Sequence, residues 1–569
     1  MVKRAREEAD GIDESHSKRF KSSVVDRLSR LSDELILRVL SYLPVAQLVV
    51  CQRDVVLSYA DEAYQALAGD DQIWKQQYYE RFVRPRAKKI PGVKEDGSAD
   101  ESIRLASKAS RWLGEEHLIK RGVKMNWKKQ YKLRHNWTRG SAVVSEIPVA
   151  EEASIPPVLV QMHEKVIYTA DTDGLRAWSA REEEKMVAKI SFAPAVTGSP
   201  PTALAIDPRI SNGTSKIAVG FESGAFSVYV LDHAKARFHC SYSHVASSNG
   251  VISAISISWP YVVTMTATQL LSLYAFKQPT APAVDQDILD PPRLLHSLKS
   301  STIWPPLSTS LRAMEDSITI SVAYALPTYL SGWTVGLQEV KVSPAGELIE
   351  SRLAAAISRH YRPLIFSFSP LMQHLSAPSA AAATASTSRE LRQIHSKPTS
   401  LSYTHPYLLV SHPDNTLTIY LVNSTAESLT IGAGSRLWGH TSSVSGAHVG
   451  DRGKAVSVST RGDELRVWEL EGGFASSAAK KRLSGLKMSV RIRPESRHTR
   501  TKNSTVRDKS SVTQTLSTRG TGSFATEQRL DDTSELTLTR GWVGFDEENV
   551  VVLKEQSRGG QALVVYDFT

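Results

Sequence analysis

The sequence contains only two cysteines, Cys51 and Cys240, among its 569 residues. Two cysteines cannot build a disulfide framework or a zinc site, and their scarcity fits a reducing compartment. No apolar run is long enough to span a bilayer, and no hydrophobic signal-peptide core follows Met1. We therefore expect a protein without a membrane partner, located in the nucleus, the cytoplasm or both.

Recognisable catalytic motifs are also missing. The run Gly432-Ala433-Gly434 lacks the third glycine and the following helix of a phosphate-binding loop. No nucleophile elbow and no His-Glu-x-x-His occurs. His405 and His412 flank a predicted strand, but without neighbouring carboxylates or cysteines a structural role is favoured over metal binding. The sequence thus predicts a non-enzyme with no cofactor and no metal, and an enzyme whose site follows none of these motifs stays an alternative.

The composition is that of a folded protein, with 41% hydrophobic and 22% charged residues. A chain of this length predicts several domains or one large repeat domain. The net charge of +10 is spread widely along the chain. This charge weakly favours acidic partners and does not by itself indicate nucleic acid.

The first 26 residues are polar and charged, which predicts a disordered basic tail over 1–26. Lys3-Arg4-Ala5-Arg6 and Lys18-Arg19-Phe20-Lys21 form two basic clusters at the spacing of a bipartite nuclear import signal. The other interpretation is a solvated tail that keeps the protein soluble.

The stretch from Leu31 to Pro44, LSDELILRVLSYLP, predicts an amphipathic helix. Ser32 can cap it, and the carboxylates that follow suit the positive end of the helix dipole. Apolar residues then recur at helical spacing, and Pro44, which has no N–H, is expected to end the helix. A second short apolar run, Val45 to Cys51, follows. Two short helices cannot bury so broad an apolar face between themselves, so they need a partner surface.

This pattern, continued by Leu67-Ala68 and Asp71-Gln72-Ile73-Trp74, resembles an F-box. The match weakens after Cys51, where an extra segment precedes the leucine and alanine. The resemblance implies an F-box over 27–85 that docks on the small Skp-family adaptor of a cullin–RING ubiquitin ligase. The adaptor-binding residues that it implies are Leu31, Leu35, Ile36, Val39, Leu40, Leu43, Pro44, Leu48, Val49 and Trp74.

A basic, aromatic stretch runs from Trp127 to Trp137. Basic residues interleaved with aromatic ones could bind nucleic acid by stacking and charge neutralisation. However, Trp127, Tyr131 and Arg134 recur at helical spacing, and the pattern is similar to the linker helix of F-box proteins with WD repeats. We favour a helical linker over 86–138 whose aromatic residues pack the F-box onto the next domain, and we consider nucleic acid an unlikely partner.

From Ser141 onward, short β-branched runs alternate with turn residues. Val166 to Trp178 reads as strand, Asp-Gly turn, strand, and the plan recurs to give about seven β units. We therefore predict a multidomain α then all-β protein whose last part, 139–569, is a β-propeller. The strand Ala142 to Ser145 is expected to close the ring by pairing with the final unit, since closure removes exposed sheet edges.

The clearest unit begins at Gly439-His440 and ends at Trp468. It resembles a WD repeat, so the propeller is WD-repeat-like. The resemblance implies a buried hydrogen-bond network of His440, Ser459, Asp463 and Trp468, in which His440 is structural and not catalytic. Three segments fit no repeat, and we predict disordered insertions near 278–292, 376–396 and 494–532.

Together these patterns predict the substrate-recognition subunit of an SCF-type ubiquitin ligase, acting in proteasomal degradation. The adaptor, and through it the cullin, would bind the F-box, and the propeller would hold a protein substrate of unknown identity. The alternative is a WD-repeat scaffold without a ligase role. Receptors of phosphorylated substrates use arginine clusters. Arg176, Arg436, Arg461 and Arg466 lie near predicted strand ends, but the sequence does not tell which way they face.

Overall fold

The computed structural model describes two compact units, 1–134 and 135–569, in those parts of the chain where residues are placed. The described residues are 31–53, 67–84, 126–181, 186–192, 198–209, 213–277, 289–300, 303–328, 332–356, 396–450, 453–462, 464–470, 489–494, 536–556 and 559–569. The predicted basic tail, 1–26, and the segment 54–66 after the second helix lie outside them. So do the three predicted insertions, apart from 289–292, Ser396 and Pro494.

The first unit is helical. Its helices are α1 (Asp33–Ser41), α2 (Val45–Arg53), α4 (Asp71–Tyr78) with the π-helical turn η2 (Tyr79–Val83), and α8 (Trp127–Arg139). Helix α8 continues past Arg134 into the second unit. In the described part of the chain, no helix has both the length and the apolarity needed to cross a bilayer.

The second unit consists of seven antiparallel sheets, which we number as blades 1 to 7. Blade 1 contains β2 (Leu159–His163), β3 (Val166–Asp171), β4 (Gly174–Ser179) and β5 (Met186–Ile190), and blade 2 contains β6 (Pro201–Ile206), β7 (Thr214–Phe221), β8 (Phe226–Asp232) and β9 (Arg237–His244). Blade 3 contains β10 (Ile252–Ser258), β11 (Tyr261–Thr266), β12 (Leu270–Ala275) and β13 (Arg293–Lys299). Blade 4 contains β14 (Trp304–Ala313), β15 (Ile318–Pro327), β16 (Trp333–Val342) and β17 (Leu348–Ala355). Blade 5 contains β18 (Ser400–Thr404), β19 (Tyr407–Ser411), β20 (Thr416–Ser424), β21 (Leu429–Ile431) and β22 (Ser435–Trp438). Blade 6 contains β23 (Val444–Val449), β24 (Lys454–Ser459), β25 (Leu465–Glu469) and β26 (Ser489–Arg491). Blade 7 contains β28 (Leu536–Phe545), β29 (Asn549–Gln556), β30 (Gln561–Asp567), β1 (Ser141–Ala150) and β27 (Arg493–Pro494).

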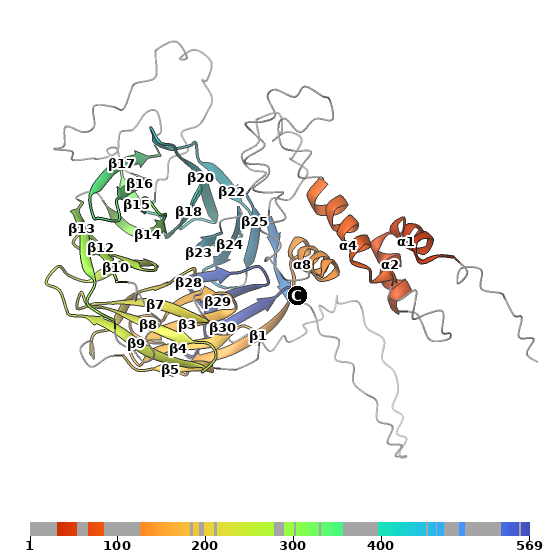
Figure 1. Cartoon of the computed structure of the whole chain (residues 1–569), viewed down its shortest axis with the longest axis horizontal. Helices are drawn as coiled ribbons and strands as arrows, with labels where there is room; N and C mark the ends of the chain where they lie inside the picture. The colour runs from red at the N-terminus through yellow and green to blue at the C-terminus, as the bar shows by residue number, and fades with distance from the viewer. Residues whose placement is uncertain are drawn as a thin grey trace, which may run out of the picture. The chain divides into compact units, whose positions relative to one another are not determined.

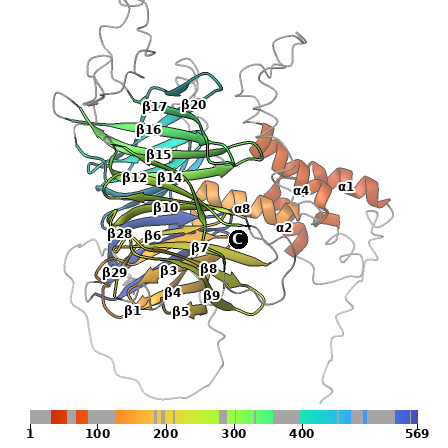
Figure 2. The ribbon, with the colours of Figure 1, turned by 60° about the vertical axis from the view of Figure 1, so that its left-hand side comes forward.

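The two ends of this unit meet in blade 7. Strand β1 pairs antiparallel with β30, with Val143 opposite Asp567 and Ser145 opposite Val565. The first strands of neighbouring blades pack on one another, and β2 packs on β28 to complete the ring. Figure 1 shows the blue strands β28–β30 beside the orange strand β1, and Figure 2 shows the same neighbourhood from another direction. The predicted count of about seven units is therefore confirmed, and the predicted closing strand pairs as expected.

Apolar side chains fill the spaces between neighbouring blades. Tyr168 and Leu175 of blade 1, for example, pack against Ile217 and Phe221 of blade 2. Leu289, which the sequence placed in an insertion, packs against the cluster between blades 2 and 3, and its backbone N–H donates to the Ser241 carbonyl. The β-branched and aromatic composition of the strands supplies this filling.

The ring has two distinct faces because the strands of each blade alternate in direction. The turns that join the second and third strands lie on one face, together with the starts of the first strands. We call this the upper face, and it carries the turns Asp171–Gly174 of blade 1 and Thr460–Gly462 of blade 6. The turns that join the first and second strands lie on the opposite, lower face.

Candidate functional site: an apolar helix face and a buried polar network

The helical unit is held together by a small apolar core between α1, α2 and α4. Ile36 and Leu40 of α1 pack with Leu48 of α2, with Ala68 and with Ile73 of α4. The Trp74 indole donates to the Ala68 carbonyl at 2.9 Å, and Asp70 Oδ1 caps α4 by accepting from the Gln72 N–H at 2.7 Å. This core holds α1 against α4.

Two predicted helix signals act differently from the expectation. Ser32 occupies the N-cap position of α1, but its side chain makes no capping hydrogen bond; its carbonyl accepts the N–H groups of Leu35 and Ile36. Helix α1 ends at Ser41, three residues before Pro44. The Pro44 carbonyl instead accepts the N–H groups of Gln47 and Leu48, so Pro44 directly precedes α2 and closes its first turn.

The ten predicted adaptor-binding residues fall into three groups by burial. Ile36, Leu40, Leu48 and Trp74 are buried; Leu43 and Val49 are half-buried; and Leu31, Leu35, Val39 and Pro44 are exposed. The four buried residues belong to the core of the helical unit, and their side chains are not available to a partner in this arrangement. Adaptor binding by the ten residues stays a prediction, and for these four the structure shows a role in the core.

The exposed apolar residues of α1 form one stripe. Leu35 and Val39 lie one turn apart on α1 and are each 52% exposed, and Leu31, two residues before the helix, is exposed at its N-terminal end. Tyr42, which the sequence analysis did not single out, is 77% exposed and extends the same stripe by three residues. Its i, i+3 spacing from Val39 was the signal that could have identified it. We call Leu31, Leu35, Val39 and Tyr42 the α1 stripe.

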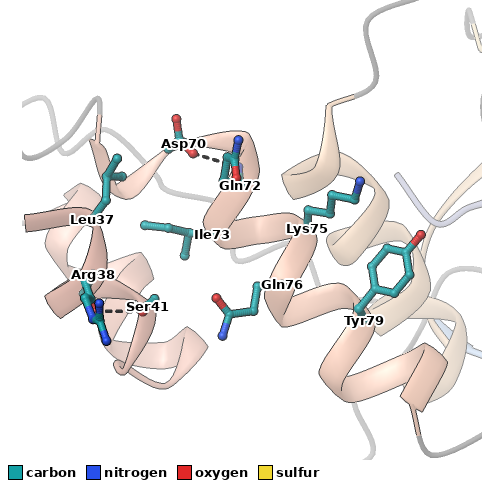
Figure 3. Close-up of a pocket in the computed structure, with 9 residues that line it drawn as sticks. All are labelled: Leu37, Arg38, Ser41, Asp70, Gln72, Ile73, Lys75, Gln76 and Tyr79. Carbon is teal, nitrogen blue, oxygen red and sulfur yellow. Dashed lines mark hydrogen bonds between the residues drawn. The ribbon is translucent and has the colours of Figure 1, made fainter. Parts of the chain in front are cut away.

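A groove of about 720 Å³ opens between α1 and α4. Leu37, Arg38 and Ser41 line it from α1, and Ile73, Gln76 and Tyr79 line it from the α4 side. Figure 3 shows Ile73 and Gln76 extending from α4 toward α1, whereas the Tyr79 ring extends away from α1. The groove offers hydrogen-bonding groups beside an apolar floor, next to the helix that carries the α1 stripe.

The aromatic residues of the basic stretch are buried. Trp127 and Tyr131 pack within the helical unit, where the Tyr131 ring lies 5.5 Å from Trp74 and the Trp127 ring 5.6 Å from Tyr78. Trp137 packs within the propeller unit, stacked 4.0 Å from Phe568, and its indole donates to the Glu547 carbonyl at 2.9 Å. All three rings are below 10% exposure, so they serve packing and are not free to stack on bases.

Blade 6 contains a buried polar network around a serine. Ser457 Oγ accepts from the Trp468 indole at 2.7 Å and is hydrogen-bonded to His440 Nε2. The structure therefore brings His440 and Trp468 together, but through Ser457 and not through the predicted Ser459. Ser459 Oγ accepts from the Glu464 N–H instead, at 3.1 Å. The predicted turn residue Asp463 lies outside the described residues.

The carboxylate of this network is Glu464, which sequence reasoning missed. Its Oε2 accepts from the N–H of Thr441 at 2.7 Å, and its Oε1 accepts from Nε of Arg466 at 2.7 Å. Burial alone would raise the pKa of this carboxyl, but the hydrogen bonds from Thr441 and Arg466 outweigh it and hold the pKa below its usual value. Glu464 thus connects the loop that contains Thr441 with strand β24, through Ser459, and with strand β25, through Arg466.

Blade 1 repeats part of this arrangement. The Trp178 indole donates to Thr169 Oγ1 at 2.9 Å, and Arg176 pairs with Asp171 at 2.7 Å. In both blades the arginine stands opposite the hydroxyl residue on the neighbouring strand. The hydroxyl, the turn carboxylate, the arginine and the tryptophan therefore form one recurring structural unit.

The arginines considered for phosphate binding are mostly committed to such pairs. Arg176 pairs with Asp171 and Asp173, Arg436 with Asp414, and Arg466 with Glu464. Arg461 is exposed in a turn on the upper face. A cluster of free guanidinium groups is therefore not found among the described arginines of this set.

The two histidines considered for metal binding are each hydrogen-bonded to a neighbouring side chain. His412 is buried and hydrogen-bonded to Thr418 Oγ1 at 2.8 Å, and burial lowers its pKa to about 4. His405 lies 3.3 Å from the Tyr403 hydroxyl. In the described ranges, no group of three or more His, Cys, Asp or Glu side chains could hold a metal ion.

Comparison with known proteins assigns the propeller to a family. The model of the F-box protein pof12 beta-propeller matches residues 142–569. No curated protein is significantly similar to the chain. Similar solved structures include U3-55K (8% identity, TM-score 0.40, 75% of this chain and 98% of that one). They also include the Cps50 (Swd1) propeller of Myceliophteria thermophila (9% identity, TM-score 0.37, 75% of this chain and 100% of that one). Another is Sqt1 of Saccharomyces cerevisiae (7% identity, TM-score 0.38, 75% of this chain and 98% of that one). The chain belongs to the F-box protein pof12 beta-propeller family.

Proposed function

We propose that this protein is the substrate-recognition subunit of an SCF-type ubiquitin ligase, in which the helical unit binds a Skp-family adaptor and the propeller binds the substrate. The observation that carries the proposal is the α1 stripe. Its members are exposed, although Ile36 and Leu40 on the same helix are buried. Exposed apolar side chains gathered on one helix face mark a docking surface for another protein.

The family assignment supports the same function, because its name describes F-box proteins. In this proposal the chain performs no bond chemistry. It raises the effective concentration of a substrate lysine near the ubiquitin-loaded enzyme that the cullin brings. The protein would act in the nucleus or the cytoplasm, where the ligase and its substrates are found.

The decisive experiment is a binding measurement with a purified Skp-family adaptor. The double variant Leu35→Asp, Val39→Asp places two charges on the α1 stripe and leaves the core of the helical unit intact. We expect its affinity for the adaptor to fall at least tenfold. A substitution of the buried Leu40 would be a poor test, because it would also disrupt the core.

The matched control is Met314→Asp, an equally drastic change at a residue of the propeller that is 68% exposed. It should bind the adaptor like the unmodified chain. Equal binding by the double variant and the control would contradict the proposal. Failure of the unmodified chain to bind the adaptor or to co-purify with a cullin would favour a propeller scaffold without a ligase role.

A further inference from the structure

The upper face of blades 4 and 5 exposes two tryptophans. Trp304 is 45% exposed at the start of β14, and Trp438 is 65% exposed at the end of β22. Among the described residues, these are the only tryptophans in the exposed class. A third, the half-buried Trp333, begins β16 on the same face. Exposed tryptophan is rare on a protein surface and is enriched at binding hot spots.

Cations lie beside two of these rings. The Arg436 guanidinium is 5.0 Å from the centre of the Trp438 ring, and Lys397 Nζ is 5.5 Å from that of Trp333. The pair between Arg436 and Asp414 holds the first of these cations in place. A cation over an aromatic face orders both groups before a ligand arrives.

The positive charge continues onto blade 6. Arg461 is exposed in the turn between β24 and β25, and the described residues offer it no carboxylate within ion-pair distance. Strand β14 packs on β18, and β18 packs on β23, so blades 4, 5 and 6 are consecutive around the ring. We call Trp304, Trp333, Lys397, Trp438 and Arg461 the upper-face patch.

The charge on this face is uneven. The loops of blades 7, 1 and 2 expose Glu151, Glu152 and Glu222 on it. The cations of the upper-face patch carry the opposite sign, and the exposed Asp414 beside them is paired with Arg436. The guanidinium groups of Arg176 and Arg466 are already bound by carboxylates, so among the described residues of this face these two arginines are not free to grip a phosphate bidentately. Single cations beside apolar rings suit carboxylates next to an apolar side chain.

We propose that the upper-face patch binds an acidic, unphosphorylated peptide segment that carries an apolar anchor. Lys397 and Arg461 attract the carboxylates of Asp or Glu residues, and the anchor packs on one of the exposed tryptophan rings. Under the proposed function, on which this substrate assignment rests, such a segment would be the signal by which a substrate is recognised. The binding itself does not require the adaptor.

The test is a selection of random dodecapeptides displayed on phage against the full-length protein. We expect the recovered peptides to be enriched in Asp and Glu and to share an apolar residue. A synthetic peptide from the selection should bind at least tenfold more weakly to Trp304→Ala, Trp438→Ala and to Lys397→Glu, Arg461→Glu. A control variant with Met186→Ala and Met314→Ala, both on the lower face, should bind it unchanged.

Three outcomes would overturn the proposal: recovered peptides that are basic or neutral, a need for phosphoserine, or undiminished binding by both patch variants with unchanged thermal stability. The double variant Leu35→Asp, Val39→Asp separates this test from that of the proposed function. It should lose the adaptor and keep the peptide. Loss of adaptor binding alone therefore does not contradict the proposal for the upper-face patch. Loss of peptide binding alone does not contradict the proposed adaptor surface.

Discussion

Helix α1 and blade 6 depart from ordinary burial in opposite directions. Helix α1 leaves Leu35 and Val39 more than half exposed, whereas blade 6 buries His440 and Glu464 almost completely. Exposed apolar surface is costly unless a partner covers it, and buried polar groups are costly unless each finds a hydrogen-bond partner. In blade 6, Ser457 is hydrogen-bonded to His440 Nε2, and Thr441 and Arg466 donate to the Glu464 carboxylate.

The difference suggests different roles for the two regions, with blade 6 supporting the fold and the α1 stripe serving binding. The polar groups of blade 6 fix the shape of the ring, because a hydrogen bond in a buried network tolerates little displacement. The α1 stripe is exposed among the residues that the structure describes, and under the proposed function it binds another protein. Substitutions at the two places should therefore separate cleanly into losses of stability and losses of binding.

The largest expected effect comes from Ser457→Ala in blade 6. The substitution leaves the Trp468 indole N–H and His440 Nε2 without their shared partner in a buried site. Two such groups should lower the free energy of unfolding of the propeller by about 4 kcal/mol. Thr169→Val in blade 1 is the matched comparison, because it orphans only the Trp178 indole. Urea denaturation should show about half the loss there, and equal losses would contradict a special role for the histidine.

The second effect is that of Leu40→Ala in α1. Leu40 is 6% exposed and packs on Leu48 and Ile73, so truncation leaves a cavity in the core of the helical unit. We expect the local free energy of opening to fall by about 3 kcal/mol. Hydrogen exchange measured by mass spectrometry should show faster exchange over 33–48 and no change in the propeller strands. Unchanged exchange over these residues would place Leu40 outside the core.

The sequence predicted the architecture well because its signals are local. Closure by 142–145 and the seven units follow from strand and turn patterns that each lie within a few residues. Local patterns do not decide whether Ser457 or Ser459 is the partner of the tryptophan. Both serines lie on the same side of β24, and only the pairing of Ala455 with Trp468 across the blade decides which one the indole reaches.

The α1 stripe could be predicted only in part for a similar reason. Helical spacing joins Leu35, Ile36, Val39 and Leu40 into one broad apolar face. Which half of that face is buried depends on Ile73, which lies more than thirty positions later in the chain. A pattern within one helix carries no information about that contact, so the sequence analysis grouped core residues with surface residues.

The third effect is a dependence of propeller stability on pH. His412 has a pKa of about 4 in the folded state, because burial disfavours its charged form, and about 6.5 when unfolded. A lowered pKa stabilises the fold above pH 6.5, and this contribution is lost as the pH falls toward 4. The facing charges of Asp414 and Arg436 act in opposite directions on this group.

Between pH 7 and pH 5, His412 alone should reduce the free energy of unfolding by about 2 kcal/mol. The variant His412→Gln, which keeps a hydrogen-bonding group near Thr418 Oγ1, should lose less stability over the same interval. Urea denaturation at the two pH values measures the difference. Equal pH dependence in the variant and the unmodified chain would show that this histidine is not the group that titrates.

The smallest expected effect is that of Leu35→Ala on stability. Leu35 is 52% exposed and its neighbours on the α1 stripe are exposed as well, so its truncation should change the stability of the helical unit by less than about 0.5 kcal/mol. Hydrogen exchange over 33–48 should therefore match that of the unmodified chain, while adaptor binding weakens. A loss of protection as large as that of Leu40→Ala would mean that Leu35 supports the fold, and it would remove the distinction between the two sides of the helix on which the docking assignment depends.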